Sequence, residues 1–170
     1  MANYSYVDAS TQIKSAVREI NTRITLGMRS RAYRASNELR NASQLVLRGQ
    51  RSGRRYNVPG TGRVKYNKRN KTATITYRKY TASAPGEPPA VRTGAFRMSW
   101  QTETQANGSP STGFYVSSKI KSSTRTDNGS HLLGQILEEG TSRMAPRPYQ
   151  EKIQQKALPK IKKIYEEPYL

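Results

Sequence analysis

The chain has 170 residues, of which 30 are Lys or Arg and 11 are Asp or Glu, so its formal net charge is +19. Only 34% of the residues are hydrophobic and the mean hydropathy is −0.87, which predicts a modest core with long peripheral segments. The absence of cysteine excludes disulfides, thiol nucleophiles and cysteine zinc sites. No apolar run approaches the roughly 20 residues that cross a bilayer, so we expect no membrane partner.

Residues 9–48 carry one sustained helical pattern. Apolar residues recur there mostly at steps of three and four and form one stripe, namely Ile13, Val17, Ile20, Ile24, Met28, Ala35, Leu39, Ala42 and Val46. Forty helical residues span about 60 Å, whereas a compact domain of this size has a radius of gyration of only about 15 Å. The helix is therefore expected either to break near Gly27 or to extend beyond its domain, where a partner would cover the stripe.

Residues 62–119 are expected to form a mainly antiparallel sheet. Residues 63–66 and 72–81 predict the arms of a hairpin, and the polar residues 68–71 predict its turn. The second arm alternates apolar and polar residues, which is typical of a half-buried strand. Two strands of the sheet therefore come from this hairpin.

Two further strands are predicted after a proline-rich loop. Phe96, Met98 and Trp100 alternate with polar residues and predict a third strand. Asn107-Gly108 is a turn signal, and residues 114–119 predict a fourth strand. We therefore expect a four-stranded sheet.

The remaining segments complete a single domain over residues 1–170. The polar residues 120–130 predict a mobile loop, and residues 131–138 a short apolar element whose type the pattern leaves open. Residues 148–167 predict a C-terminal helix that Pro159 kinks or restarts. The predicted fold class is α+β, with a long N-terminal helix, a mainly antiparallel four-stranded sheet and a C-terminal helix.

The sequence lacks the parts of a catalytic site. The single histidine, His131, has only Asp127 as an acid close in sequence, so no Ser/His/Asp set can be assembled. Glu138 and Glu139 are adjacent and point apart, and one histidine with scattered carboxylates does not form a metal cluster. We therefore expect no enzyme, no catalytic residue, no cofactor and no bound metal.

The positive charge is concentrated between Glu38 and Glu87, where no acidic residue occurs. A basic run of this kind favours a polyanion or an acidic protein as partner. The candidates to face DNA or an acidic partner are Arg51, Arg54, Arg55, Lys68, Arg69 and Lys71. Tyr56, Tyr66 and Tyr77 nearby could stack on bases in a free-standing nucleic-acid-binding protein, although their alternation predicts that they turn partly into a core. The sequence leaves both interpretations open.

Two stretches carry a resemblance to a known family. The first is the stiff loop Pro85-Gly86-Glu87-Pro88-Pro89, followed by a Thr93-Gly94 turn. The second leads into the last helix through Glu138, Gly140, Thr141, Ser142, Met144, Arg147, Pro148 and Tyr149. Together they resemble the neck, or tail-completion, proteins of tailed bacteriophages with long tails, which join the DNA-filled head to the tail.

The resemblance implies a structural virion protein without catalytic residues or cofactors. It implies a homo-oligomeric ring, six- or twelve-fold, around the DNA channel of the neck, with assembly in the host cytoplasm. The implied partners are further copies of the chain, an adjacent neck ring such as the head-completion or stopper protein, the tail terminator, and viral duplex DNA. A tail terminator ring protein is a further alternative.

The same stretches contain the candidates for an assembly interface, since a stiff loop loses little entropy on docking. They are Pro85, Gly86, Glu87, Pro88, Pro89, Arg92, Glu139, Arg143 and Arg147. The charged residues among them can alternatively cap local turns within one subunit.

Overall fold

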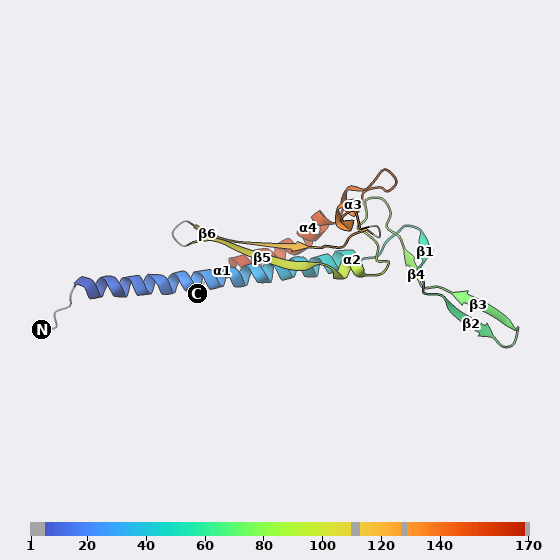
Figure 1. Cartoon of the computed structure of the whole chain (residues 1–170), viewed down its shortest axis with the longest axis horizontal. Coiled ribbons are helices and arrows are strands. Elements are labelled where there is room, and N and C mark those ends of the chain that lie inside the picture. The colour runs from blue at the N-terminus through green and yellow to red at the C-terminus, as the bar shows by residue number, and fades with distance from the viewer. Residues whose placement is uncertain (1–5, 110–112, 127–128, 169–170) are drawn as a thin grey trace.

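The computed structural model describes residues 6–109, 113–126 and 129–168. Its shape is elongated, with helix α1 (Tyr6–Arg48) along the long axis and a hairpin arm, β2 (Arg63–Asn67) with β3 (Thr72–Thr76), projecting at the other end (Figure 1). Helix α4 (Gln150–Glu166) is the last element, and the described chain ends two residues after it. The predicted α+β class with a long N-terminal and a C-terminal helix is confirmed.

Helix α1 is continuous over 43 residues and does not break at Gly27. One glycine in a helix costs only about 1 kcal/mol relative to alanine, which the neighbouring turns can offset. At 1.5 Å per residue the helix is about 65 Å long. Its buried residues begin at Arg31 and Ala32, whereas Ile13 and Ile20 are 65% and 56% exposed. Of the two alternatives, the helix that extends beyond its domain is therefore the correct one.

Helix α4 covers the second half of α1 and runs antiparallel to it. Near its start, Ile153 and Ala157 pack with Ala42 and Leu47 of α1. Near its end, Glu167 forms an ion pair with Arg34 at 2.5 Å. The helix continues through Pro159, so the predicted restart is wrong, while the predicted kink stays a prediction.

The core is an aromatic cluster beneath this helix pair. Phe96, Trp100 and Tyr149 lie with ring centroids 5.5–5.9 Å apart in edge-to-face arrangements. Tyr149 is only 2% exposed, and its hydroxyl donates to the carbonyl of Gly134 at 3.1 Å. Burial and the nearby Glu138 carboxylate raise the pKa of Tyr149 to about 12, so this hydroxyl remains a donor at neutral pH.

The predicted four-stranded sheet is wrong, and so is its third strand. The described residues form two-stranded antiparallel sheets instead: β1 (Arg55–Asn57) with β4 (Lys79–Thr81), β2 with β3, and β5 (Gln101–Ser109) with β6 (Gly113–Lys121). Phe96 and Met98 lie in the helical turn α2 (Ala95–Met98). Residues 96 and 100 are four apart, so a helical turn places both on one side, as their contact shows.

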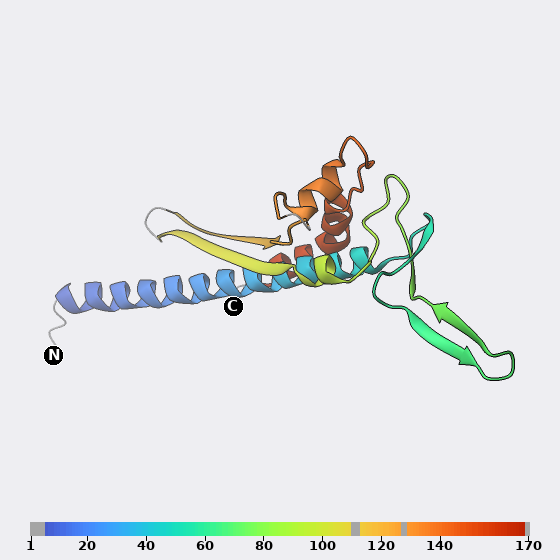
Figure 2. The ribbon, with the colours of Figure 1, turned by 45° about the vertical axis from the view of Figure 1, so that its right-hand side comes forward.

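The expected fourth strand is part of β6, which forms a nine-residue ladder with β5. This ribbon lies along α1, and the Ser118 hydroxyl donates to the carbonyl of Ala32 at 2.6 Å (Figure 2). The predicted loop at residues 120–130 begins within β6 and includes an antiparallel bridge between Arg125 and Leu132. Residues 127–128 lie outside the described chain, and the mobility of the loop stays a prediction. The segment 131–138, whose type the sequence left open, forms most of helix α3 (Leu133–Glu139).

The hairpin predicted at residues 63–81 is shorter and more exposed than expected. Strand β3 ends at Thr76, and residues 79–81 leave the arm to pair with β1. All ten residues of β2 and β3 are exposed. The expectation of a half-buried strand is therefore wrong, because the part of the chain that the structure describes places no second layer on either face of the arm.

Candidate assembly and DNA-facing surfaces

The two motif stretches, far apart in sequence, meet in space. The amide of Gly86 donates to the carbonyl of Pro146 at 3.2 Å, and Lys152 Nζ donates to the carbonyl of Gly86 at the same distance. Pro88 and Pro89 are buried, while Pro85 and Gly86 are exposed at the bend of the loop. The candidate interface residues of the loop are thus divided between an exposed bend and an anchored base.

Glu87 is the polar anchor of this loop. Its carboxylate accepts hydrogen bonds from the Ser52 hydroxyl at 2.6 Å, the Ser52 amide at 3.1 Å and the Ala84 amide at 2.9 Å. These bonds, the Ser52 hydroxyl first, lower the pKa of Glu87 to about 2. Glu87 therefore caps a turn within its own subunit, and a further role at an interface stays a prediction.

Neutralising Glu87 should make stability less dependent on pH. A carboxyl group whose pKa is about 2 in the folded chain and near 4.5 when unfolded stabilises the fold above pH ~4.5 and loses that effect as the pH falls towards 2. We expect the melting temperature of the native chain to exceed that of Glu87→Gln at pH 7, with the gap closing between pH ~4.5 and ~2. A gap that is constant over this range in thermal unfolding curves would contradict the assignment.

Arg51 links the proline-rich loop to the end of α1 through hydrogen bonds. Its guanidinium donates to the carbonyls of Pro89 and Val46 at 3.0 and 2.9 Å and to that of Gln50 at 2.8 Å. Burial lowers the pKa of Arg51, with Glu87 acting in the opposite direction. Since its donors are used within the subunit, we leave Arg51 out of the surface proposed to face DNA.

The second motif stretch caps the last helix. Glu138 accepts from the amides of Tyr149 and Gln150 at 3.0 and 3.3 Å, which satisfies two donors at the start of α4. Glu139 accepts from the Gln135 side chain, and Arg143 is exposed in the turn between Thr141 and Met144. Glu138 therefore has a capping role that the sequence interpretation missed, although the residue belongs to the motif.

Gly140 occupies a backbone conformation that is essentially restricted to glycine, with φ 79° and ψ −169°. A Cβ atom there would lie 2.6 Å from the carbonyl oxygen of Met144 and 2.8 Å from the nitrogen of Pro146. We expect Gly140→Ala to lower the free energy of unfolding by about 1–3 kcal/mol, measured by chemical denaturation. Gly60→Ala is the control, because Gly60 also has a positive φ but nothing within 4 Å of its Cβ; an equal loss there would contradict the close contact as the cause.

A pocket of about 560 Å³ opens between the two motif stretches. Its floor is apolar and includes Val91, Phe96 and Leu137. Arg92, Arg97, Arg125 and Arg147 also line it, and none of the described residues adds a carboxylate to the lining. Arg92 and Arg147, two of the candidate interface residues, therefore share one surface, which suits an acidic or polar segment of another protein chain.

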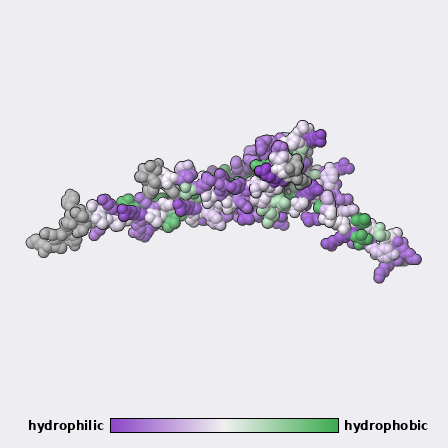
Figure 3. Space-filling view, viewed as in Figure 1, coloured by the Kyte–Doolittle hydropathy of each residue, from purple (hydrophilic) through white to green (hydrophobic). Residues whose placement is uncertain are grey.

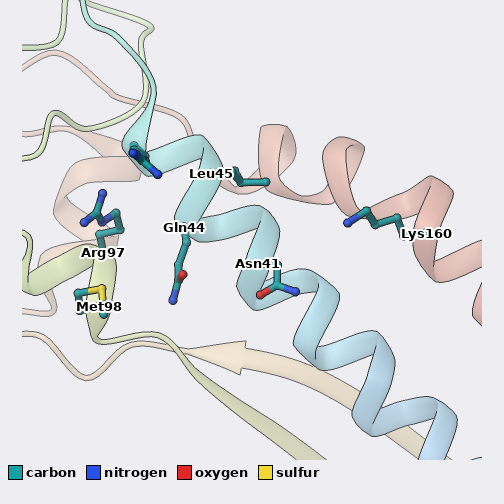
Figure 4. A pocket seen from close by; sticks show the side chains of 7 residues that line it. Asn41, Gln44, Leu45, Arg97, Met98 and Lys160 are labelled. Atoms are coloured by element: carbon teal, nitrogen blue, oxygen red, sulfur yellow. The ribbon is translucent and has the colours of Figure 1, made fainter.

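A second, more open hollow of about 800 Å³ lies where α1, α2 and α4 meet (Figure 4). Asn41, Gln44 and Leu45 of α1, Arg97 and Met98 of α2, and Lys160 of α4 line it. Lys160 forms an ion pair with Glu38 at 2.9 Å. The lining offers amides, cations and two exposed apolar side chains but no nucleophile beside a base, so it suits a protein contact better than catalysis.

The other candidate basic residues fall into two groups on the arm. Arg54 and Arg55 lie at its base, where the Arg54 guanidinium lies 5.8 Å from the ring centroid of Tyr56. Lys68, Arg69 and Lys71 lie at its tip, between β2 and β3. The five-residue strands β2 and β3, each about 17 Å long, lie between the two groups. Tyr56 and Tyr66 are 45% and 61% exposed, so they do not turn into a core.

The described residues contain no group of three or more His, Asp or Glu side chains placed to hold a metal ion. His131 is exposed, and its nearest acid in sequence, Asp127, lies outside the described chain. Over the same described residues, no helix is long and apolar enough to span a membrane.

The comparisons with known proteins give no relative: no family model, no curated protein and no solved structure matches this chain.

Proposed function

We propose that this chain is a structural protein of a tailed bacteriophage that forms a ring in the neck, where it completes the tail or joins it to the head around the DNA channel. The observation that carries the proposal is the elongated shape. Residues 10–20 of α1 and all ten strand residues of the hairpin arm are exposed, and neighbouring subunits would cover them (Figure 1). The two motif stretches that resemble neck proteins support the same function.

The charge distribution fits a subunit that lies beside duplex DNA. Arg54, Arg55 and the three cations at the arm's tip lie in a stretch of sequence without acidic residues, on a chain of net charge +19. Duplex DNA carries about one negative charge per 1.7 Å of its axis, so such a surface attracts it without reading its sequence. The proposed partners are further copies in a six- or twelve-fold ring, an adjacent head-completion or stopper ring, the tail terminator, and viral DNA.

The proposal includes no catalytic activity and no cofactor, and it places the protein in the virion neck after assembly in the host cytoplasm. Light scattering and electron micrographs of the purified protein test it, with rings as the expected result. Particles that lack the protein should accumulate as unjoined heads and tails. A chain that remains monomeric at all concentrations, or that is dispensable for joining, would overturn the proposal.

A free-standing protein that binds nucleic acid without sequence preference is the second candidate. The observation that favours it is the exposure of Tyr56, Tyr66 and Tyr77 beside the basic residues, since exposed rings can stack on bases. Monomers that decorate DNA in micrographs would support this candidate. A tail terminator ring is the remaining alternative, and the position of the protein in intact particles distinguishes it from the neck ring.

A further inference from the structure

The pocket between the two motif stretches combines cationic and apolar lining residues. It holds about 560 Å³ and lies between α2 and α3, in the widest part of the molecule (Figure 1). Val91, Phe96 and Leu137 form its apolar floor. The face of the molecule seen in Figure 3 is mostly hydrophilic, and its hydrophobic patches are small and separate. In this pocket, cations and apolar side chains share one concave site.

The four described cations that line the pocket are all arginines. None of the ion pairs among the described residues involves Arg92, Arg97, Arg125 or Arg147. The Arg125 side chain donates to the carbonyl of Gly129 at 3.1 Å, which neutralises no charge. Arg97 and Arg147 are half-buried, and charges partly removed from water attract an opposite charge more strongly. The pocket therefore gathers positive charge for which the described residues supply no counter-charge.

The lining indicates what kind of ligand would fit. A guanidinium group matches a carboxylate through two parallel hydrogen bonds, and an apolar floor suits an aromatic or aliphatic side chain. Duplex DNA also carries anions, but it is a stiff rod that cannot enter a pocket of this volume, and its phosphates bring no apolar group to the floor. A short peptide segment with both carboxylates and an apolar side chain meets both requirements.

The acidic residues of this chain are poor candidates to fill the pocket of a second copy. Acids are adjacent in the sequence only at Glu138-Glu139 and Glu166-Glu167. Glu138 caps the start of α4, and Glu167 is paired with Arg34. Neither pair therefore offers two free carboxylates. Two copies, each of net charge +19, also repel each other, which favours a different, acidic protein.

We propose that this pocket binds a short acidic segment of another protein. Carboxylates of the segment pair with Arg92 and Arg147, and one aromatic or aliphatic side chain packs on Phe96 and Leu137. The contact needs a single subunit, so it stands whether or not the chain forms the ring proposed above.

Selection from random peptides tests the chemistry of the ligand. A yeast-displayed library of random heptapeptides is selected on the purified full chain, and the enriched peptides are sequenced. The expected peptides contain at least two acidic residues and one aromatic or large aliphatic residue. Enrichment of peptides without acidic residues, or of acidic peptides without an apolar residue, would overturn the proposal.

Variants then separate the pocket from the overall positive charge. Fluorescence anisotropy measures the affinity of the most enriched peptide. Replacing Arg92 and Arg147 together by Gln should weaken binding about tenfold. Replacing Arg18 and Arg40 by Gln removes the same two charges from exposed positions on α1 and should change affinity less than about threefold. Circular dichroism should be unchanged in both double variants, and equal losses of affinity would overturn the proposal.

A third variant tests the apolar floor without changing charge. Ala95 is exposed and lines the pocket, so Ala95→Phe should fill part of it and weaken peptide binding several-fold. Unchanged affinity would contradict an apolar contact in the pocket.

Two further measurements address the other occupants. If a 20-base single-stranded oligonucleotide loses as much affinity as the peptide in the Arg92 and Arg147 double variant, the pocket binds nucleic acid and the proposal is wrong. If that variant loses self-association in light scattering while it keeps its affinity for the peptide, a second copy is the occupant and the proposal is again wrong. Unchanged self-association together with the loss of peptide binding is the expected result.

Discussion

Replacing Tyr149 by alanine is expected to lower the free energy of unfolding by about 3–5 kcal/mol, the largest effect of any single substitution considered for this chain. The side chain is 2% exposed and contacts both Phe96 and Trp100. Its loss would leave a cavity between α1 and α4 and remove the hydrogen bond to Gly134. Because domains are stable by only about 5–15 kcal/mol, the variant is expected to be close to unfolding at 37 °C.

Chemical denaturation measures this loss of unfolding free energy. One further variant isolates the contribution of the hydroxyl group, and another serves as an exposed control. Tyr149→Phe keeps the ring and removes only the hydroxyl, so it should cost about 1 kcal/mol. Tyr165→Ala, near the end of the same helix, removes an equal side chain that is 46% exposed and should cost much less than Tyr149→Ala. Equal losses for the two alanine variants would contradict the placement of Tyr149 in the core.

Neutralising the tip of the hairpin arm is expected to weaken DNA binding and to reduce its dependence on salt. The affinity for duplex DNA falls with salt with a slope of about −0.9 per phosphate neutralised. If Lys68, Arg69 and Lys71 each contact one phosphate, replacing all three by Gln should make the slope less steep by about 2.7. Fluorescence anisotropy with a labelled duplex at several salt concentrations measures the slope.

The matched control changes the same charge at a distance from the arm. Lys156, Lys162 and Lys163 are exposed on α4, and replacing them by Gln removes the same three charges. The arm variant should change the slope much more than this control, and two duplexes of unrelated sequence should behave alike. Equal slopes for the two triple variants would show that net charge acts rather than the arm, and a strong sequence preference would contradict a channel role.

The helices were predictable because their signals are local and repeat many times. Nine apolar positions at helical spacing predict α1, and the face that contains Tyr149, Ile153, Ala157 and Ile164 of the last helix is the one buried against it. The length argument also anticipated that α1 could extend beyond its domain. Gly140 stood out in the sequence as part of a motif, and its backbone conformation now explains why a glycine stands there.

Short elements were not predictable in the same way, because three alternating residues fit more than one structure. Phe96, Met98 and Trp100 match a strand by their alternation, but Phe96 and Trp100 also match a helical step of four. The aromatic cluster with Tyr149, which is distant in sequence, selects the helical turn. The hairpin arm shows the opposite case: its alternation was correct, yet all ten residues of β2 and β3 are exposed.

By itself, the sequence determined a basic α+β chain with a long helix and with two motif stretches that resemble neck proteins. The count of charged residues, the spacing of apolar residues and short motifs can all be read from neighbouring positions in the chain. Only the tertiary structure decided which charges are used within the subunit. Arg51 and Glu87 looked like surface groups, but Arg51 connects the proline loop to the end of α1, and Glu87 connects it to Ser52 just after that helix. Arg54, Lys68 and their neighbours stay on the arm and remain available to partners. The difference arises because hydrogen-bond partners come from segments far apart in the chain, which no local pattern can reveal.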